Sequence, residues 1–227
     1  MALLLTTCAE AGLYGLIGKR IGDPNHDEVP TTTTMLGWIN VVNNDAAILT
    51  DCFQASGSIT GAANAESYSV STLTGLIRIL DVVDKTSGIS YRPVSRTEYH
   101  GYRNNIVGNS LSGVYVYNLF GYDAAGRKIY ILPTVVTDAV VTIEYSLVEE
   151  AIADTAAPQG LLANYAEIFI EGVAAIYFDA SGDSQEADKA FGKYMMWINK
   201  LNSEVGINPS IKPEASLLWR DGYGNRS

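Results

Sequence analysis

The residue best able to act as a general base in this chain is His100, one of only 2 histidines among 227 residues. A histidine titrates near neutral pH, so it can activate a nucleophile within hydrogen-bond reach. Ser110 or Asp123 could complete a hydrolase centred on His100. A serine nucleophile typically has the spacing Gly-x-Ser-x-Gly, which residues 57–61 and 108–112 approach without matching. We therefore predict that the chain is not an enzyme.

Metal-ligating side chains gather at two places in the sequence. At the first, His26 has acidic neighbours in a polar loop: Asp23, Asp27 and Glu28. The second is a run of carboxylates that could be compared with a calcium loop: Asp179, Asp183, Glu186 and Asp188. A calcium loop needs glycine at its sixth position, where this chain has Ser184. We expect a solvated loop at the first place and helix capping at the second, with no metal and no cofactor.

Composition excludes two further classes of function. Cys8 and Cys52 are 44 positions apart and predict two small buried apolar residues rather than a redox pair. Two glycine-rich patterns are typical of loops that bind phosphate groups: Gly-x-x-x-x-Gly-Lys-Ser/Thr, and Gly-x-Gly-x-x-Gly after a strand. Neither pattern occurs in the sequence. With 25 acidic against 15 basic residues, the chain has a net charge of -10. Such a chain has no bulk attraction for phosphates, which excludes a general nucleic-acid binder.

The beginning of the chain resembles a lipoprotein leader only superficially. A signal peptide has a basic segment and then about 7–15 apolar residues. Here no basic residue precedes Lys19, and the apolar run stops at Leu5. The most apolar stretch, residues 168–178, contains Glu171 and is shorter than the roughly 20 residues of a membrane span. We expect a soluble protein that keeps its N-terminus and has no membrane partner.

The order of the elements predicts a mixed α and β fold. Helices at both ends of the chain, residues 1–55 and 148–206, are expected to pack together as one helical bundle domain. Residues 56–147 are rich in Ser, Thr, Gly and Tyr, and they predict an inserted antiparallel β domain. Residues 207–227 follow a glycine and a proline, and they predict an extended C-terminal arm.

Apolar stripes at helical spacing define the expected helices. In the first helix the stripe contains Leu4, Cys8, Leu13, Leu16 and Ile17. In the second helix, which begins within residues 31–34 and ends near Asp51, the stripe contains Met35, Trp38, Ile39, Val42, Ala46 and Leu49.

Two later helices are expected to form an antiparallel hairpin that is broken at residues 181–182. The first of them buries Leu162, Tyr165, Phe169, Val173, Ile176 and Tyr177. In the second, Asp183 followed by Glu186 three residues later is typical of a capping box. That helix buries Ala187, Ala190, Phe191, Tyr194, Ile198 and Leu201.

Runs of β-branched and aromatic residues predict four strands, at residues 76–83, 113–120, 127–132 and 140–147. Residues 123–126 form the expected hairpin turn, in which Gly126 can adopt a positive φ. Pro133 lacks a backbone N–H and is expected to end the third of these strands.

The C-terminal arm and the acidic hairpin are the expected interaction features. Trp219 stands with Leu217 and Leu218 in a tail too short to bury it, so either the body of the chain or a neighbouring protein must cover this cluster. Tyr223 completes the set of interface candidates. Residues 149–204 contain ten acidic and three basic side chains, which is a solvated helix face or a surface that repels a polyanion.

The order of these parts resembles the head-to-tail adaptor proteins of tailed bacteriophages, and is most similar to the P22-type tail accessory factors of short-tailed phages. The resemblance covers roughly residues 30–205. The segments that carry it are LGWIN (36–40), GISYRPV (88–94), GRKIYILP (126–133), VTIEY (141–145), LLANYAE (161–167) and the helix of residues 187–201.

The resemblance implies a structural protein of the virion neck, assembled in the host cytoplasm. It implies a ring of about twelve copies beneath the portal, joined below to a tail or nozzle component. The helices would surround a channel through which genomic DNA passes without specific binding, and an acidic lumen fits that role. Family members of this kind extend a C-terminal segment onto the portal, which here would be residues 208–227, with Leu217, Leu218, Trp219 and Tyr223 as contacts.

An alternative function is a binding module in which the β domain recognises a glycan or a receptor. Aromatic rings stack on sugar rings, and several tyrosines could form such a platform if they are exposed. These residues are Tyr99, Tyr102, Tyr115 and Tyr117.

Overall fold

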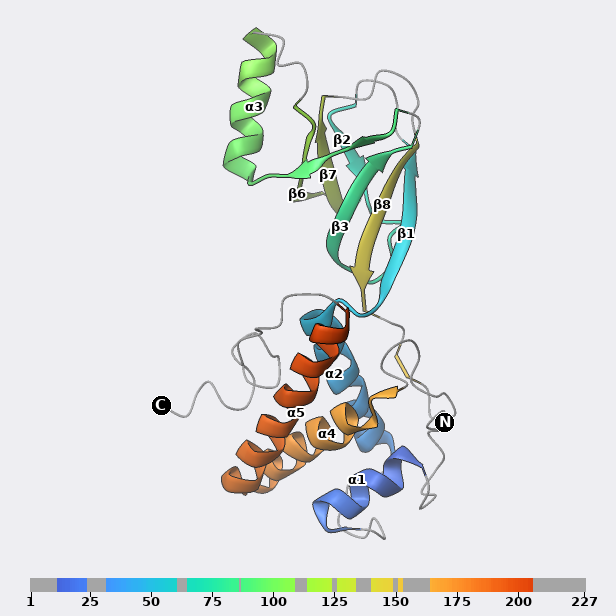
Figure 1. Ribbon diagram of the computed structural model, residues 1–227, viewed down its shortest axis with the longest axis vertical. Helices are drawn as coiled ribbons and strands as arrows, with labels where there is room; N and C mark the ends of the chain where they lie inside the picture. The colour runs from blue at the N-terminus through green and yellow to red at the C-terminus, as the bar shows by residue number, and fades with distance from the viewer. Residues whose placement is uncertain are drawn as a thin grey trace. The chain divides into compact units, whose positions relative to one another are not determined.

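The computed structural model describes residues 12–23, 32–60, 65–85, 87–108, 114–123, 126–133, 140–148, 151–152 and 164–205. The chain divides into two compact units (Figure 1). One comprises Met1–Phe53 and Val148–Ser227, and the other is Gln54–Leu147. The first is helical, and the second contains two β-sheets and a helix, so the predicted mixed α and β fold is confirmed. None of the described helices is both long and apolar enough to cross a membrane.

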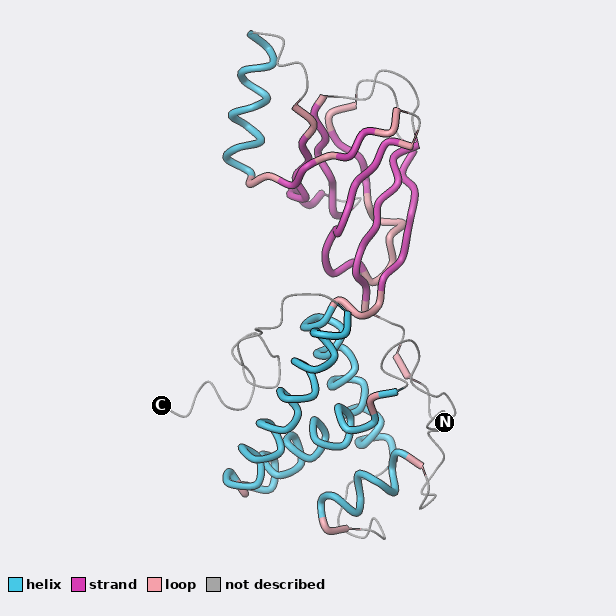
Figure 2. The backbone as a smooth tube through the Cα atoms, in the orientation of Figure 1, coloured by secondary structure: helices cyan, strands magenta, loops and turns pink. Residues whose placement is uncertain are grey.

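The helical unit contains α1 (Leu13–Ile21), α2 (Thr32–Thr50), α4 (Ala166–Ser181) and α5 (Ser184–Val205), drawn in cyan in Figure 2. Helix α4 packs against the other three, and α2 also contacts α5. The apolar stripe predicted for α5 is buried along its whole length, as is most of the stripe predicted for α2. Trp38 is half-buried and packs edge-to-face on Tyr177 of α4, with 6.4 Å between the ring centroids.

The turn between α4 and α5 has the predicted break and cap. Gly182 ends α4 with a φ of +83°, a backbone conformation that glycine adopts without steric cost. The backbone N–H of Asp183 then donates to the carbonyl of Phe178 at 2.9 Å. The side chain of Asp183 accepts a 3.2 Å hydrogen bond from the N–H of Glu186. The Asp183 carboxylate therefore caps α5, as the sequence predicts, whereas the reciprocal bond of a capping box is not formed, because the N–H of Asp183 donates to Phe178 rather than to Glu186.

A second glycine lets α4 approach α2 closely. A Cβ atom added to Gly172 would lie 2.8 Å from both methyl groups of Val42 and 3.2 Å from the ring of Tyr194. Such distances are too short for ordinary carbon–carbon contacts, so only glycine fits where α2, α4 and α5 meet.

The inserted unit consists of two four-stranded sheets that bury one shared apolar cluster. The first sheet has the order β1-β8-β3-β4, with β1 Gln54–Thr60, β8 Val140–Leu147, β3 Leu76–Asp84 and β4 Ile89–Ser90. The second has the order β2-β7-β6-β5, with β2 Ser67–Ser69, β7 Gly126–Leu132, β6 Val116–Asp123 and β5 Arg92–Pro93. The predicted hairpin is present, because Asp123 pairs with Gly126 at the end of β6 and β7.

Two features of this unit depart from the all-antiparallel expectation. Strand β5 pairs with β6 in parallel, while every other strand pair of the described residues is antiparallel. The second departure is a helix, α3 (Arg96–Gly108), where only strands and loops were expected. The helix begins with a capping box, in which the N–H of Ser95 donates to Oε2 of Glu98 at 2.9 Å and the N–H of Glu98 donates to Oγ of Ser95 at 3.2 Å.

Candidate interaction surfaces

Two of the three residues considered for catalysis lie in the described part of the structure. His100 lies half-buried on α3 beside the ring of Tyr99, and Asp123 is the last residue of β6. Ser110 and His26 fall outside the described residues. Within the described ranges, no group of three or more His, Cys, Asp or Glu side chains could hold a metal ion.

The predicted portal contacts cannot be placed on either unit. Leu217, Leu218, Trp219 and Tyr223 all lie outside the described residues, together with the rest of the 207–227 arm. Their role stays a prediction, and the surfaces below come from the described helices and strands.

The net negative charge of the chain comes entirely from the helical unit. Gln54–Leu147 contains seven acidic and seven basic residues, so the net charge of -10 belongs to the rest of the chain.

Ion pairs neutralise part of the negative charge of the helical unit. Glu171 of α4 accepts from Nε of Arg20 at 2.9 Å and from Nζ of Lys193 at 3.5 Å. Lys189 pairs with Glu186 at 2.7 Å, and the guanidinium of Arg20 also lies 5.5 Å from the ring centroid of Phe178. Arg20 thus fixes α1 against the α4–α5 hairpin.

A buried polar contact joins α2 to α5. The hydroxyl of Tyr194 donates a 2.6 Å hydrogen bond to Oδ2 of Asp45, and neither side chain is exposed to solvent. Burial, and secondly the Asp45 carboxylate, raise the pKa of the Tyr194 hydroxyl well above its ordinary value, so the phenol stays protonated and remains a donor. Further along, Nδ2 of Asn202 lies 3.5 Å from the carbonyl oxygen of Leu49. Both contacts fix how α2 lies along α5.

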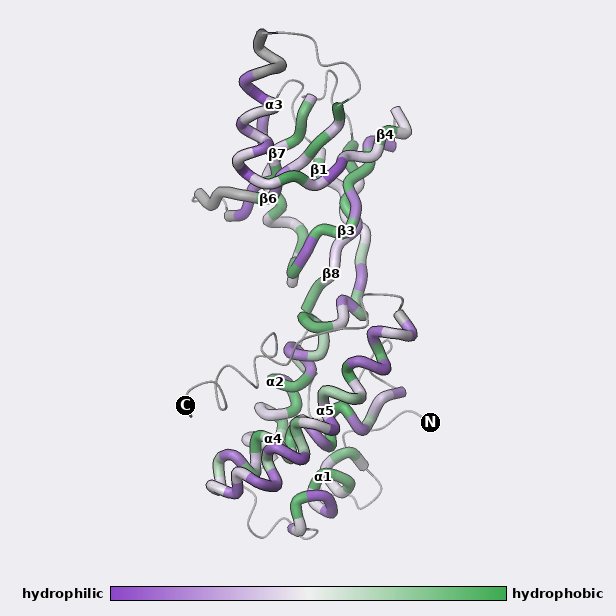
Figure 3. Tube along the Cα trace, turned by 60° about the vertical axis from the view of Figure 1, so that its left-hand side comes forward, coloured by the Kyte–Doolittle hydropathy of each residue, from purple (hydrophilic) through white to green (hydrophobic). Residues whose placement is uncertain are grey.

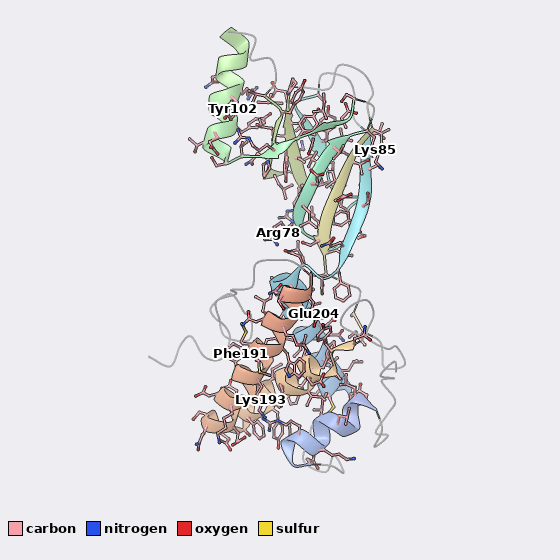
Figure 4. All side chains as sticks on the ribbon, in the orientation of Figure 1. Arg78, Lys85, Tyr102, Phe191, Lys193 and Glu204 are labelled. Carbon is pink, nitrogen blue, oxygen red and sulfur yellow. The ribbon has the colours of Figure 1, made fainter. Side chains whose placement is uncertain are left out.

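The outward face of α5 combines lysines with one exposed methionine. Lys189, Lys193 and Lys200 recur at helical spacing, with the side chain of Met196 58% exposed between them. A groove of about 490 Å³ borders Met196 and Gly192, and Arg20, Glu186, Lys189 and Lys193 complete its lining. Figure 4 shows Lys193 in the first half of this helix and Glu204 in its last turn.

A smaller cleft lies where α5 passes the start of α4. It has a volume of about 330 Å³ and is lined by Asn164, Tyr165, Glu167, Trp197, Lys200 and Glu204. The ammonium of Lys200 is 4.5 Å from the ring centroid of Trp197, a cation–π contact. The hydroxyl of Tyr165 donates to Oε2 of Glu204. Four of the six lining residues therefore already contact one another.

The outward face of α2 is different in kind, because it has no charge. Gly37, Val41, Asn44 and Ile48 recur along one side of the helix, opposite the buried stripe. Val41 is 43% exposed and Ile48 is 37% exposed. The apolar stripe predicted from the sequence is the buried one alone. A further signal is present in the sequence, because apolar residues occupy both sides of α2.

The tyrosines considered as a glycan platform are not all available for stacking. Tyr99 is 1% exposed and Tyr117 is 4% exposed, so the platform expected from the sequence is wrong for these two residues. Tyr99 packs against Val116 and Leu132, where its ring meets that of Tyr130. Burial raises the pKa of Tyr99 to about 12. Only Tyr102 and Tyr115 of the four remain half-buried.

A groove of about 610 Å³ lies between β1 and β2. Its lining is Ser58, Ile59, Thr60, Ala65, Ser67, Tyr68, Ser69, Ser71 and Thr72. The described residues of this lining carry many hydroxyl groups and no charged side chain. A neutral hydroxylic ligand is the chemistry that such a groove suits best.

Comparison with known proteins gives one family. A family model described as SU10 adaptor protein matches residues 11–210, a range that extends across both units of the chain. No curated protein matches the chain.

Proposed function

Because the chain belongs to the SU10 adaptor protein family, a family of phage head-to-tail adaptors, we propose that it forms a ring that joins the capsid portal to the tail and keeps a DNA channel open. The observation that carries this proposal is the family match over residues 11–210, which includes the helical unit and the whole inserted unit. In this proposal the two units serve as separate domains of the adaptor, and residues 207–227 serve as an arm.

The charge distribution supports a channel role for the helical unit. The whole net charge of -10 belongs to that unit, while the inserted unit is neutral. A ring of about twelve such subunits would surround the channel with a negative field, which repels phosphates. DNA could then slide through the lumen without adhering to it.

The location and the partners follow from the same proposal. The protein would occupy the neck between capsid and tail after assembly in the host cytoplasm. Its partners would be the portal above, a tail or nozzle component below, and further copies of itself. Lateral contacts can be weak in such a ring, since copies held side by side on a portal meet at a high effective concentration. We also propose that the chain is similar to the P22-type tail accessory factors, which is a more specific assignment than the adaptor family itself.

The arm supplies the contact to the portal in this account. Leu217, Leu218, Trp219 and Tyr223 are the residues proposed to insert into a portal groove, because large apolar side chains dominate such anchors.

The direct experiment is co-sedimentation of the chain with its portal ring, compared with a variant that ends at residue 206. We expect the full chain to sediment with the portal and the shortened chain to stay in the supernatant. The helical circular dichroism of the two should match, because the described helices end at Val205. A shortened chain that binds the portal equally well would remove the arm from the proposal.

A binding-module function is the second candidate, and the groove between β1 and β2 is the observation that favours it. Its hydroxyl-rich, uncharged lining suits a neutral sugar better than a charged ligand. A glycan array probed with the full chain tests this function. Binding that is lost in a Ser58→Arg variant would support it, and the absence of any binding would reject it.

A further inference from the structure

The outward face of α2, defined by Gly37, Val41, Asn44 and Ile48, is uncharged over the whole length of the helix. The only charged residue in Thr32–Thr50 is Asp45, which is fully buried and bonded by Tyr194. A helix at a protein surface usually carries charged or polar residues on its outer side. The outward face of α5 does so with Lys189, Lys193 and Lys200, and Figure 3 shows purple (hydrophilic) residues interspersed with green ones along this helix.

Apolar residues on both sides of a helix are typical of a helix that is covered on both sides. The inner side of α2 is covered by α4 and α5. The described residues leave its outer side exposed, since Val41 is 43% and Ile48 is 37% accessible to solvent. A Cβ atom added to Gly37 would have nothing within 4 Å, so the face is also open at the second turn of α2.

A second apolar patch lies on α5, formed by Met196 and Gly192. Met196 is the most exposed large apolar side chain of the described residues, at 58%. A Cβ atom at Gly192 would also have nothing within 4 Å, which leaves room for an incoming helix beside Met196. The described chain exposes four large apolar side chains in all, and three of them belong to these two patches.

Two different apolar patches on one subunit are what a head-to-tail contact requires. In a closed ring, each subunit presents one surface to the next subunit and a different surface to the previous one. We propose that the outward face of α2 of one copy packs against the Met196–Gly192 patch on α5 of the neighbouring copy. This inference rests on the proposed ring function, and it names the lateral interface of that ring.

The charges around the α5 patch agree with this pairing. Lys189 and Lys193 flank the patch and already pair with Glu186 and Glu171 of their own subunit. The α2 face brings no carboxylate that would compete for them, and no cation that would be repelled. The lysines stay at a solvated rim while the apolar side chains fill the centre, an arrangement common to stable protein interfaces.

Charge insertion tests the α2 side of the contact. Val41→Glu and Ile48→Glu place a carboxylate where the neighbour would have to desolvate it. Val140→Glu is the matched control, because Val140 is also 43% exposed but lies on β8 of the other unit. The readout is the number of copies per portal ring by native mass spectrometry. We expect portals saturated with wild type and with the control, and a fall of about tenfold or more in fully occupied portals with the two α2 variants.

Site-specific cross-linking tests which surface the α2 face meets. Ile48→Cys and Met196→Cys are introduced into a background with Cys8→Ser and Cys52→Ser, and portal-bound copies are treated with a short bismaleimide. The double variant should give a ladder of cross-linked subunits, while either substitution alone should give monomers. Dimers formed by Ile48→Cys alone would show that two α2 faces meet each other, which overturns the pairing proposed here.

The outcomes separate this inference from the function on which it rests. If wild type fails to associate with the portal at all, the adaptor function fails and the lateral interface falls with it. If wild type saturates the portal and Ile48→Glu saturates it equally well, the ring stands and this interface is wrong. Circular dichroism and the melting temperature of each variant show that a loss of occupancy does not come from unfolding.

Discussion

The hydroxyl of Tyr194 on α5 donates a 2.6 Å hydrogen bond to Oδ2 of Asp45 on α2, across 149 positions of sequence and with both side chains removed from solvent. A buried carboxylate is costly unless hydrogen-bond donors surround it, so the Tyr194 phenol helps to stabilise the packing of α2 on α5. The helical unit therefore contains a specific buried hydrogen bond between two helices that are far apart in the sequence.

Tyr194→Phe should destabilise the helical unit by about 2–3 kcal/mol, because it removes a donor from a buried carboxylate. Tyr165→Phe is the matched control, since it removes a hydroxyl that bonds to the exposed Glu204 and should cost less than about 1 kcal/mol. Urea unfolding of both variants, followed by far-UV circular dichroism, measures the difference. Equal losses in the two variants would contradict the special role of the Asp45 contact.

Gly172→Ala should destabilise the chain by about 1–3 kcal/mol, because the added methyl group would overlap Val42 and Tyr194 where three helices meet. Gly192→Ala is the control, since it adds a methyl group to open space on α5. That change should stabilise the helix by about 0.5–1 kcal/mol, owing to the lower backbone entropy of the unfolded chain. Thermal unfolding of the two variants should therefore shift in opposite directions, and a shift in the same direction argues against the close approach at Gly172.

The stability of the inserted unit should fall at alkaline pH. Burial is the largest cause that raises the pKa of both Tyr91 and Tyr99 from 10.0 to about 12. Folding therefore favours the protonated phenols, so their contribution is complete below about pH 10 and is lost as the pH rises from about 10 to about 12. The urea midpoint should be constant up to about pH 9 and decrease at about pH 11. Tyr99→Phe should reduce that decrease, and an unchanged slope in this variant would exclude Tyr99 as its cause.

The proposed role as a ring around a DNA channel predicts that the chain does not bind DNA. Fluorescence anisotropy with duplex DNA at low salt should show no binding, because the helical unit has the whole net charge of -10. A variant with Glu167→Lys, Asp188→Lys and Glu204→Lys should gain weak, salt-sensitive binding, since these three carboxylates are exposed. Tight binding by the unaltered chain would contradict a lumen that repels phosphates.

The helices and strands that could be predicted from the sequence are those with a strong apolar period. The stripe from Ala187 to Leu201 predicts α5, and the β-branched run from Val140 predicts β8, because each buries one face or both. Helix α3 was missed because Tyr99 is the only buried side chain among its described residues 96–104, so no apolar stripe marks it. The Ser95–Glu98 capping box was the available signal. Strand β1 was missed because Gln54–Thr60 is rich in small residues with low β propensity.

The interaction surfaces were harder to predict than the elements. The family resemblance predicts contacts on the arm at residues 207–227, whereas the surfaces found among the described residues lie on α2 and α5. A one-dimensional pattern shows that α2 has an apolar side, but it does not show which of two apolar sides faces the core. The bond between Asp45 and Tyr194 was also beyond prediction, since nothing in the local sequence pairs residues 149 positions apart.

The central claim is that this chain is a ring-forming adaptor, and native mass spectrometry of the full chain tests it most directly. The chain is measured alone, and then after mixing with the portal ring encoded with it. The account predicts a shift from free chain to a portal-bound set of about twelve equal copies, as closed rotational symmetry requires. Absence of any association with the portal, under every salt condition, would contradict the account.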